Sequence, residues 1–380
     1  MVPAQACHEL DAIMNVAVRD QKADPQGSRL AVVDCDIHPQ MKGIADLFAY
    51  LPERWRKHTA TYSNHMRQAL AETLAYPRMT PDVARRDAWP PNGAPPGSDL
   101  DFMREQHLDL NGVEYGILIP LRNAGAQRNL DYGAALATAV NDWQIDKWFN
   151  QEPRLRGSLL VTPEDPIAAV KEIERASADK RFVQVLLPPR MDQPAGRRRY
   201  WPVYEAAVRA GLPIGMHVGG VGGHPCTAGS GAASYYIEEH HSLVPAMQAV
   251  VTSMVLEGVF EHFPTLKVAL IEGSFAWVPA LSWRLDKQWA RLKDEVPHLT
   301  RKPSEYIREH FWFTTQPIDE PDDPKQLFDV MEWIGWNKLM FSTDYPHWDF
   351  DDPRYVFKGK LDEKYRRMIF RENAKALYGL

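Results

Sequence analysis

The chain has no long hydrophobic run, no signal-peptide pattern and no surplus of positive charge. No apolar stretch in its 380 residues approaches the roughly 18 residues that a membrane-spanning helix requires. The N-terminus lacks a basic segment followed by a continuous apolar core, so a signal peptide is not expected. The formal net charge of −6 argues against non-specific nucleic-acid binding, which needs clustered lysine and arginine. We therefore expect neither a membrane nor a nucleic acid as partner.

Cysteine is also scarce. The three cysteines, Cys7, Cys35 and Cys226, are far apart and form no CxxC motif. A thiolate zinc cluster is therefore not expected, and unpaired cysteines are typical of the reducing cytoplasm, where we expect the protein to act. Hydrophobic residues make up 44% and charged residues 25% of the sequence, which is the composition of an ordinary globular protein.

Short β-branched runs alternate with segments of helical periodicity along most of the sequence, which is typical of parallel βα units. Asp165 and Pro166 suit the start of one such helix, and Gly211 suits the end of another. Eight βα units predict an α/β fold, a (β/α)8 barrel, although a doubly wound open sheet would give a similar alternation. The predicted strands span residues 31–38, 113–120, 156–163, 182–188, 213–220, 267–273, 311–316 and 338–345.

One stretch does not follow this rhythm. Residues 40–110 are dense in proline, glycine and charge, and they follow the first strand. Insertions of this length usually cover a site or an interface, so we predict a lid over the functional site, with a surface excursion as the alternative. The predicted organisation is an N-terminal extension at residues 1–30 and one barrel domain at residues 31–380.

Acidic and histidine residues stand where four of the predicted strands end. Asp36 and His38 end the first strand and, two residues apart, face the same side. His217 ends the fifth strand, Glu272 the sixth and Asp344 the eighth. A barrel would gather all five at one rim, where carboxylates and imidazoles suit zinc, iron, manganese or cobalt. Each residue alone has an ordinary explanation, such as a helix cap or a turn, but the joint pattern favours a metal site.

These residues, together with the segment FSTDYPHWD, resemble the amidohydrolase superfamily. The similar branch contains aminocarboxymuconate semialdehyde decarboxylase and the dihydroxybenzoate decarboxylases, and the resemblance runs from about residue 31 to the closing NAKALYGL. It implies a distorted (β/α)8 barrel, one divalent metal ion and usually a homodimer. It places Asp36 and His38 as the metal ligands of strand 1, His217 as that of strand 5 and Asp344 as that of strand 8.

The sequence departs from the family pattern at two positions. The first strand more often reads His-x-His or Glu-x-x in the family, whereas Asp36 leads here, and Glu272 stands where the decarboxylases carry a histidine. The two carboxylates make the predicted site more anionic, which favours iron or manganese over zinc and leaves room for a second ion. They also remove an imidazole that would protonate the substrate carbon in a decarboxylation.

Three further histidines lie close to these positions in the sequence. We expect one of the neighbours His240 and His241 to reach the site, and assign a catalytic role to His241 and an outer supporting role to His240. The alternative is that both face solvent. His347 is predicted to orient a ligand or a bound water. The preceding segment GGVGGHPCTAGSGAAS fits no dinucleotide fingerprint and is expected to keep a loop open near a bulky substrate.

A basic segment follows the fourth predicted strand. Arg190, Arg197 and Arg199 are predicted to bind an anionic group of the substrate, because guanidinium groups pair well with carboxylates and phosphates. The alternative is a solvated helix entry or an interface. Trp348, next to the predicted site, favours an aromatic or polycyclic substrate, although tryptophan is also common core filler.

The sequence predicts an enzyme with a small-molecule substrate. The leading prediction is hydrolysis of an ester, thioester or amide bond by metal-activated water, with Glu272 or Asp344 taking up the proton. The alternative is non-oxidative decarboxylation of an aromatic or muconate-type acid on the same scaffold. A metal-loaded binding protein and a metal-independent lactonase are weaker alternatives.

Overall fold

The structure is a computed structural model, and it describes residues 30–62, 83–121, 127–218 and 233–380. Its strands form one parallel sheet in the order β1 to β8, so each strand pairs with its neighbour in sequence. A doubly wound sheet would reverse direction at a switch point, and the observed order excludes it. The strands are β1 (Val32–Ile37), β2 (Val113–Leu118), β3 (Leu155–Leu160), β4 (Phe182–Leu187), β5 (Ile214–His217), β6 (Val268–Ile271), β7 (Phe311–Thr314) and β8 (Leu339–Met340).

Backbone hydrogen bonds join β1 and the residue after it to the residues that follow β8. The amide of Cys35 donates to Phe341 O at 3.0 Å, and the amide of His38 donates to Tyr345 O at 2.8 Å. The sheet thereby closes on itself into the predicted (β/α)8 barrel. Every residue of β1 is buried, because in this barrel one face of each strand meets the interior and the other meets the surrounding helices.

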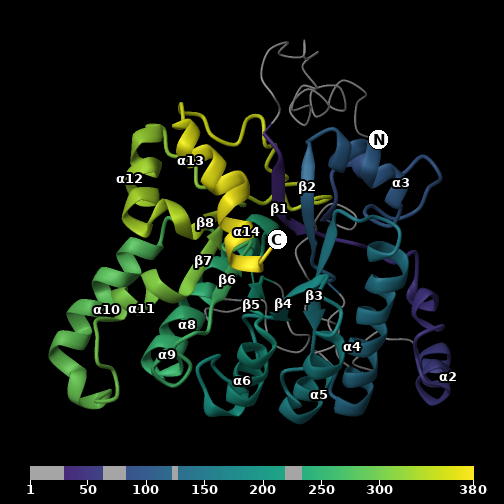
Figure 1. The fold of residues 1–380 in the computed structure, drawn as a ribbon, viewed down its shortest axis with the longest axis horizontal. Helices are drawn as coiled ribbons and strands as arrows, with labels where there is room; N and C mark the ends of the chain where they lie inside the picture. The colour runs from purple at the N-terminus through teal and green to yellow at the C-terminus, as the bar shows by residue number, and fades with distance from the viewer. Residues whose placement is uncertain (1–29, 63–82, 122–126, 219–232) are drawn as a thin grey trace. The chain divides into compact units, whose positions relative to one another are not determined.

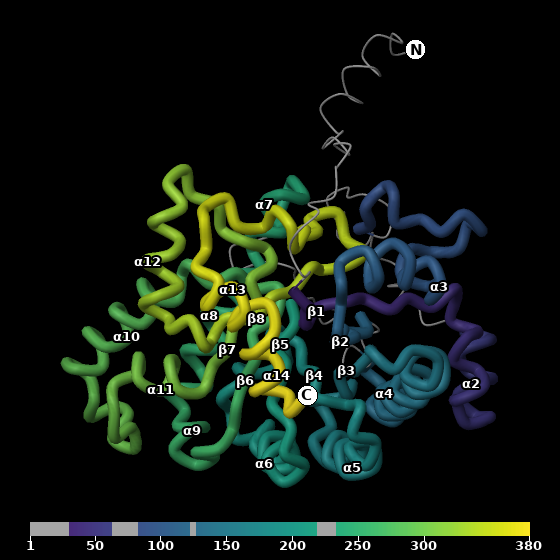
Figure 2. Tube along the Cα trace, turned by 45° about the horizontal axis from the view of Figure 1, so that its top comes forward, coloured from purple at the N-terminus to yellow at the C-terminus, as the bar shows by residue number. Residues whose placement is uncertain are grey.

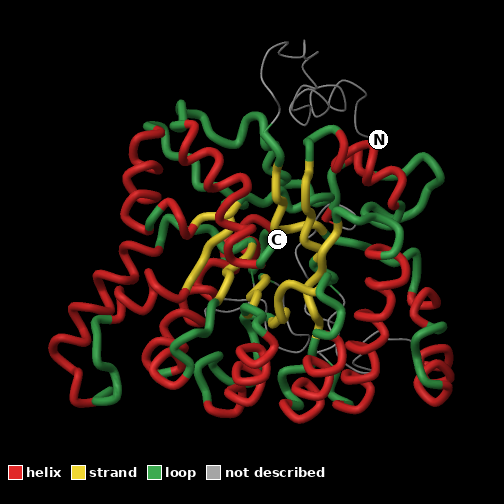
Figure 3. Tube along the Cα trace, viewed as in Figure 1, coloured by secondary structure: helices red, strands yellow, loops and turns green. Residues whose placement is uncertain are grey.

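Helices surround the strands, as Figures 1 and 2 show, and Figure 3 separates the strands from the helices by colour. The helices that follow strands carry an apolar face that packs inward. The α-helices are α2 (Glu53–Tyr62), α3 (Leu100–Met103), α4 (Leu130–Gln144), α5 (Pro166–Ala176), α6 (Trp201–Ala210), α7 (Tyr236–His241), α8 (Leu243–Leu256), α9 (Val259–His262), α10 (Val278–Leu292), α11 (Pro303–His310), α12 (Pro324–Ile334), α13 (Glu363–Arg367) and α14 (Asn373–Tyr378). Segments of π-helix extend α3, α4 and α13 at Arg104–Asp109, Ile145–Phe149 and Met368–Glu372.

Local sequence signals explain several helix ends. The Asp165 side chain accepts a hydrogen bond from the amide of Ala168 at 3.1 Å, and Pro166 begins α5, as predicted. Gly211 ends α6 in the left-handed conformation, also as predicted. The hydrophobic pattern of the sequence predicts one helix over residues 242–263, but the chain breaks into α8 and α9 at Gly258, which has a φ of 76°.

Part of the insertion after β1 lies against the ends of β1 and β8. The amide of Arg85 donates to Pro346 O, and the amide of Trp348 donates to Val83 O. Gly97 lies so close to β1 that an added Cβ would come within 2.4 Å of His38 O. This packing places residues 83–99 beside the strand ends that carry the predicted metal ligands. The functions of the insertion as a lid and of residues 1–30 as an extension stay predictions.

Candidate metal centre

Four side chains meet where β1, β5 and β6 end, and we call Asp36, His38, His217 and Glu272 the strand-end cluster. Each offers a ligand atom, and these atoms all lie within 4.8 Å of one another. His38 Nε2 is 3.2 Å from Asp36 Oδ1, and His217 Nε2 is 3.5 Å from Asp36 Oδ2 and 3.0 Å from Glu272 Oε2. β6 ends at Ile271, which pairs with His217 in the sheet. The next residue, Glu272, therefore lies beside His217 at the rim.

Both histidines are oriented for metal binding through Nε2. The Nδ1 atom of His38 contacts the carbonyl of Ile119 at 2.9 Å, and Nδ1 of His217 contacts the carbonyl of Val218. A carbonyl can only accept, so Nδ1 carries a proton in each ring and Nε2 is the nitrogen that can bind a metal ion once it has no proton. Metal-bound histidines are typically fixed by such a partner on the other ring nitrogen.

The centre of the cluster holds buried polar atoms that lack protein partners. Asp36 is fully buried, and among the described residues neither of its carboxylate oxygens has a hydrogen-bond partner. Nε2 of His217 also lacks such a partner among these residues. An unpaired buried carboxylate is costly, and a cation between these atoms removes that cost. The donor set therefore fits a divalent metal ion.

Asp344 extends the cluster on the side of β8. Its Oδ1 lies 2.7 Å from Nε2 of His38 and 2.7 Å from Nδ1 of His347. The side-chain amide of Gln316 donates through Nε2 to Oδ2 of Asp344 at 3.3 Å. The ring of His347 stacks on that of His38 with centroids 4.3 Å apart. The structure thus brings all five predicted ligands together, with His347 beside them. Their function as metal ligands stays a prediction.

The two carboxylates that follow strands have an unusual backbone. Glu272 has a φ of 56° and Asp344 a φ of 64°, values that residues other than glycine rarely adopt. The amide of Glu272 donates to Thr314 Oγ1 at 3.0 Å, and the amide of Asp344 donates to Asp36 O at 3.1 Å. Neighbouring strands therefore hold both residues in a strained conformation that turns the chain sharply at the rim.

Burial changes the proton affinity of the cluster. Burial, together with the carboxylates of Glu272, Asp349 and Asp36, raises the pKa of Asp344 well above its usual value. Burial also raises the pKa of Glu272 to about 7, although His217 opposes this shift. For His217, burial lowers the pKa, but Asp36 and Glu272 outweigh it and raise the pKa to about 10. Protons and a metal ion therefore compete for the same atoms.

A second group of ligand atoms adjoins the first. We call His240, Glu272 and Asp349 the His240 cluster, and their ligand atoms also lie within 4.8 Å of one another. His240 Nε2 is 3.1 Å from Asp349 Oδ2. The indole of Trp348 donates to the hydroxyl of Tyr236 at 3.1 Å, and its ring lies 5.6 Å from that of His240. An aromatic side chain therefore lies beside His240 of this cluster.

Other predicted site residues lie differently. His241 is exposed on α7 and belongs to none of the candidate metal groups among the described residues, whereas its neighbour His240 does. The structure therefore gives no support for a catalytic function of His241. Arg190 is half-buried, and its Nη2 donates to Ser242 Oγ at 3.0 Å. The predicted glycine-rich loop lies mostly outside the described residues.

The other two arginines have acidic partners. Arg197 lies 3.1 Å from Glu257, and Arg199 lies 3.1 Å from Glu164. Arg197 is exposed, which fits the alternative of a solvated helix entry. Binding of the substrate by these arginines stays a prediction.

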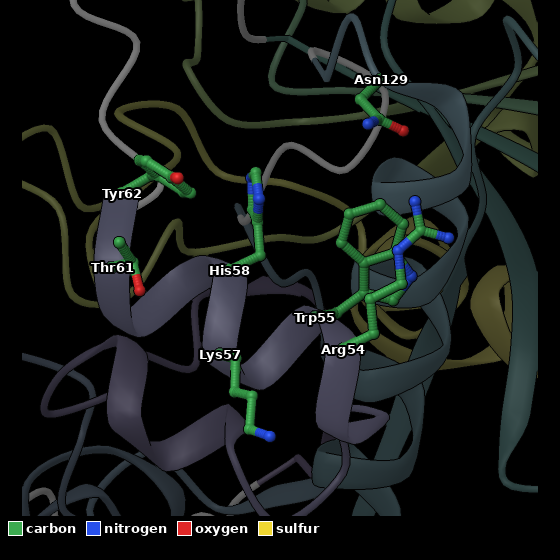
Figure 4. Close-up of a pocket in the computed structure, with 7 residues that line it drawn as sticks. All are labelled: Arg54, Trp55, Lys57, His58, Thr61, Tyr62 and Asn129. Carbon is green, nitrogen blue, oxygen red and sulfur yellow. The ribbon is translucent and has the colours of Figure 1, made fainter.

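A separate pocket of about 310 Å³ lies on α2, and none of its lining residues belongs to the two clusters. Figure 4 shows side chains of α2 around it, together with Asn129 at the start of α4. The pocket is lined by Arg54, Trp55, Lys57, His58, Thr61, Tyr62 and Asn129.

Sequence reasoning missed Gln316, Asp349 and Asp34. Gln316 and Asp349 stand after β7 and β8, so the rule that polar residues at strand ends mark a site would have found them. Asp34 is buried behind the rim, where it accepts from the amides of Thr343 at 2.9 Å and Asp36 at 3.2 Å. Only the closed barrel brings Thr343 to Asp34, so no sequence signal marks this residue.

Comparison with known proteins identifies the family. Residues 33–380 match the family model described as Amidohydrolase, so the chain belongs to this family and is an enzyme of the amidohydrolase superfamily. The gamma-resorcylate decarboxylase of Polaromonas sp. is 27% identical over 300 residues, covering 74% of this chain and 88% of the relative. That of Rhodococcus jostii is 25% identical over 348 residues, covering 82% and 98%.

Solved structures share the fold. The 5-carboxyvanillate decarboxylase of Sphingomonas paucimobilis has a TM-score of 0.66 at 20% identity, covering 92% of this chain and 99% of the other. A dihydroxybenzoic acid decarboxylase from Polaromonas sp. JS666, with bound manganese and the inhibitor 2-nitroresorcinol, has a TM-score of 0.61 at 20% identity, covering 92% and 97%. The predicted family and barrel are confirmed.

The leading prediction of hydrolysis is wrong. The relatives and solved structures reported above are decarboxylases by name, and none of them is named as a hydrolase of an ester, thioester or amide. The prediction relied on the anionic ligand set, but the same rim serves several reactions, and a ligand set alone does not fix the chemistry.

In the described part of the chain, no helix combines the length and the apolar character needed to cross a bilayer.

Proposed function

We propose that this enzyme is a metal-dependent, non-oxidative decarboxylase of a hydroxylated aromatic acid. One observation carries the proposal: a buried set of imidazoles and partnerless carboxylate oxygens ends the strands of a barrel whose relatives are decarboxylases. Gamma-resorcylate and 5-carboxyvanillate, named in those relatives and structures, are aromatic acids. Their chemistry defines the substrate class that we assign here.

Asp36, His38, His217 and Asp344 would hold the metal ion, and manganese is favoured because a similar structure contains it. The ion would supply positive charge that binds the substrate carboxylate and a neighbouring hydroxyl. The residues fix its position: backbone carbonyls hold both imidazoles, and β1 and β8 hold the two aspartates. Burial of the rim excludes water and strengthens every charge interaction in it.

The reaction needs one proton for each carbon dioxide released. The bond between the ring carbon and the carboxylate breaks, its electron pair stays on the ring carbon, and that carbon takes up a proton. Glu272 and Asp344 are the carboxyl groups nearest the two imidazoles, so we propose that one of them carries this proton. Glu272 would then replace the imidazole that the family carries at this position.

The aromatic group beside the cluster supports an aromatic substrate. Trp348 is 45% exposed although its indole is hydrogen-bonded to Tyr236, so one part of the ring is available for stacking. Arg190 is also available, because its buried Nε has no hydrogen-bond partner among the described residues. We propose that Trp348 stacks on the substrate ring and that Arg190 binds a further anionic group.

The test is a product assay with the manganese-loaded enzyme. Incubation with 2,6-dihydroxybenzoate and related hydroxybenzoates should release carbon dioxide in equal amount to the phenol formed. In heavy water, the phenol should carry one deuterium at the carbon that lost the carboxylate. A panel of hydroxybenzoates that yields no carbon dioxide, with metal bound and the fold intact, would refute the proposal.

We also propose a homodimer, as the family resemblance predicts. Light scattering of the purified chain measures its mass in solution. A mass of one chain at working concentration would contradict the prediction.

A further inference from the structure

The His240 cluster has the donors of a second cation site. Its three residues come from separate segments: His240 from α7, Glu272 from the end of β6, and Asp349 from the loop after β8. All are at least partly buried, and Asp349 is only 12% exposed in its side chain. Glu272 belongs to both clusters, so its carboxylate lies within reach of both centres.

One divalent ion does not balance the carboxylates of the rim once all of them are ionised. Asp36, Glu272, Asp344 and Asp349 bring four carboxylates into one connected group. In the described part of the chain, no ion pair joins any of the four to an arginine or lysine, and their charged partners are histidines. When all four are ionised and the imidazoles are neutral, one divalent cation leaves two negative charges. A second cation neutralises them in a region where uncompensated charge is costly.

The amide of Gln316 gives an independent indication. Gln316 is fully buried, and its Nε2 lies 3.1 Å from Asp349 Oδ2 and 3.3 Å from Asp344 Oδ2. Its Oε1 is buried without a hydrogen-bond partner among the described residues. A buried amide oxygen next to carboxylates is a typical ligand of a hard cation.

We infer that His240, Asp349 and Glu272 bind a second divalent cation, with Glu272 bridging it to the first. The predominance of oxygen donors favours manganese or iron over softer ions. The inference rests on the metal centre of the proposed function but not on decarboxylation, because occupancy is measured without substrate. The competing explanation is that His240 and Asp349 form only an ion pair.

Metal counting on the full chain separates the two explanations. The protein is freed of metal with a chelator, dialysed against manganese chloride, cleared of excess ion and analysed for manganese per chain. We expect two ions in the wild type and one in His240→Ala or Asp349→Asn. The matched control is His241→Ala, an exposed histidine on the same helix, which should keep two.

Several outcomes would overturn the inference. One ion in the saturated wild type would do so, as would two ions in the His240→Ala/Asp349→Asn double variant. Loss of both ions in a folded Asp349→Asn protein, with circular dichroism as for the wild type, would also overturn it, since Asp349 is not in the strand-end cluster.

Electron paramagnetic resonance provides a second readout. Two manganese ions bridged by one carboxylate couple magnetically, so the wild type should show a hyperfine pattern with about half the spacing of an isolated ion. Asp349→Asn should restore the pattern of the isolated ion. An isolated-ion pattern in a wild type that binds two ions would contradict the bridge through Glu272.

Discussion

Two charged regions of the chain, the strand-end cluster and the arginine segment after β4, differ in their burial and in their partners. Asp36 is fully buried and its carboxylate has no hydrogen-bond partner among the described residues. Arg197 is 56% exposed in its side chain and pairs with Glu257. A buried carboxylate with no hydrogen-bond partner and no arginine or lysine beside it indicates a ligand, whereas exposed charge with a partner needs no ligand to explain it. The sequence presents both as charged residues at or after the end of a strand, and only burial and pairing tell them apart.

The largest expected effect comes from the buried region. His217→Ala removes a donor whose Nε2 faces two carboxylates, so we expect loss of the first metal ion and at least about a thousandfold loss of kcat, or roughly 4 kcal/mol of transition-state stabilisation. Metal analysis and carbon dioxide release measure both. Full metal content with normal turnover in this variant would remove His217 from the site.

Asp344→Asn tests the proton carrier. The amide keeps the size of the side chain but cannot deliver a proton, and it is a weaker ligand than the carboxylate that we place on the metal ion. With manganese kept in excess so that the site stays occupied, kcat should fall by about a hundredfold to a thousandfold while KM changes little. Steady-state kinetics on the metal-loaded variant check this. An unchanged kcat would assign the proton to Glu272 instead.

Metal uptake should depend on pH. In the metal-free protein the pKa of Glu272 is raised to about 7, so below that pH a cation must displace a proton. The apparent affinity should fall by up to about tenfold per pH unit below about pH 10, where His217 is protonated, and more steeply below about pH 7, where Glu272 is protonated as well. Calorimetry in buffers of different ionisation enthalpy measures the proton release. Constant affinity between pH 5 and pH 8, about two units below and one above the carboxyl pKa, would contradict a role of Glu272 as a ligand.

Trp348→Ala tests the aromatic group at the rim. Loss of one stacking contact costs about 0.5–1.5 kcal/mol, so KM for an aromatic acid should rise by about two- to tenfold with kcat largely retained. The matched control is Trp283→Ala, since Trp283 is exposed on α10 and should leave KM unchanged. An equal effect of both substitutions on KM would show that Trp348 does not contact the substrate.

The smallest effect is expected in the arginine segment. Arg197→Gln breaks an exposed ion pair worth about 0–1 kcal/mol, so both the midpoint of thermal unfolding and KM should hardly change. A rise in KM specific to anionic substrates would restore the predicted binding function and blur the contrast between the two regions.

Much of the fold could be predicted, because periodicity is a local property of the sequence. The eight strands and the helix signals at Asp165, Pro166 and Gly211 each depend on a few adjacent residues. The break at Gly258 was missed, since the hydrophobic pattern continues across it and the left-handed conformation is visible only in the folded chain.

The site was predictable only in part. A carboxylate or histidine at the end of a strand is visible in the sequence, so the five residues that the structure brings together could be predicted as ligands, and their function stays a prediction. The His240 cluster was not, because α7 and the loop after β8 meet only when the barrel closes. Which of the adjacent residues His240 and His241 lies near the carboxylates depends on the orientation of α7, and the sequence does not show that orientation.

The sequence by itself determined the barrel, the family and the residues that end its strands, because these follow from local pattern and from motifs. The tertiary structure decided which charges are buried without partners, which histidine of an adjacent pair turns inward, and that one carboxylate lies between two groups of donors. Burial and distance are properties of the closed barrel, and no linear spacing encodes them.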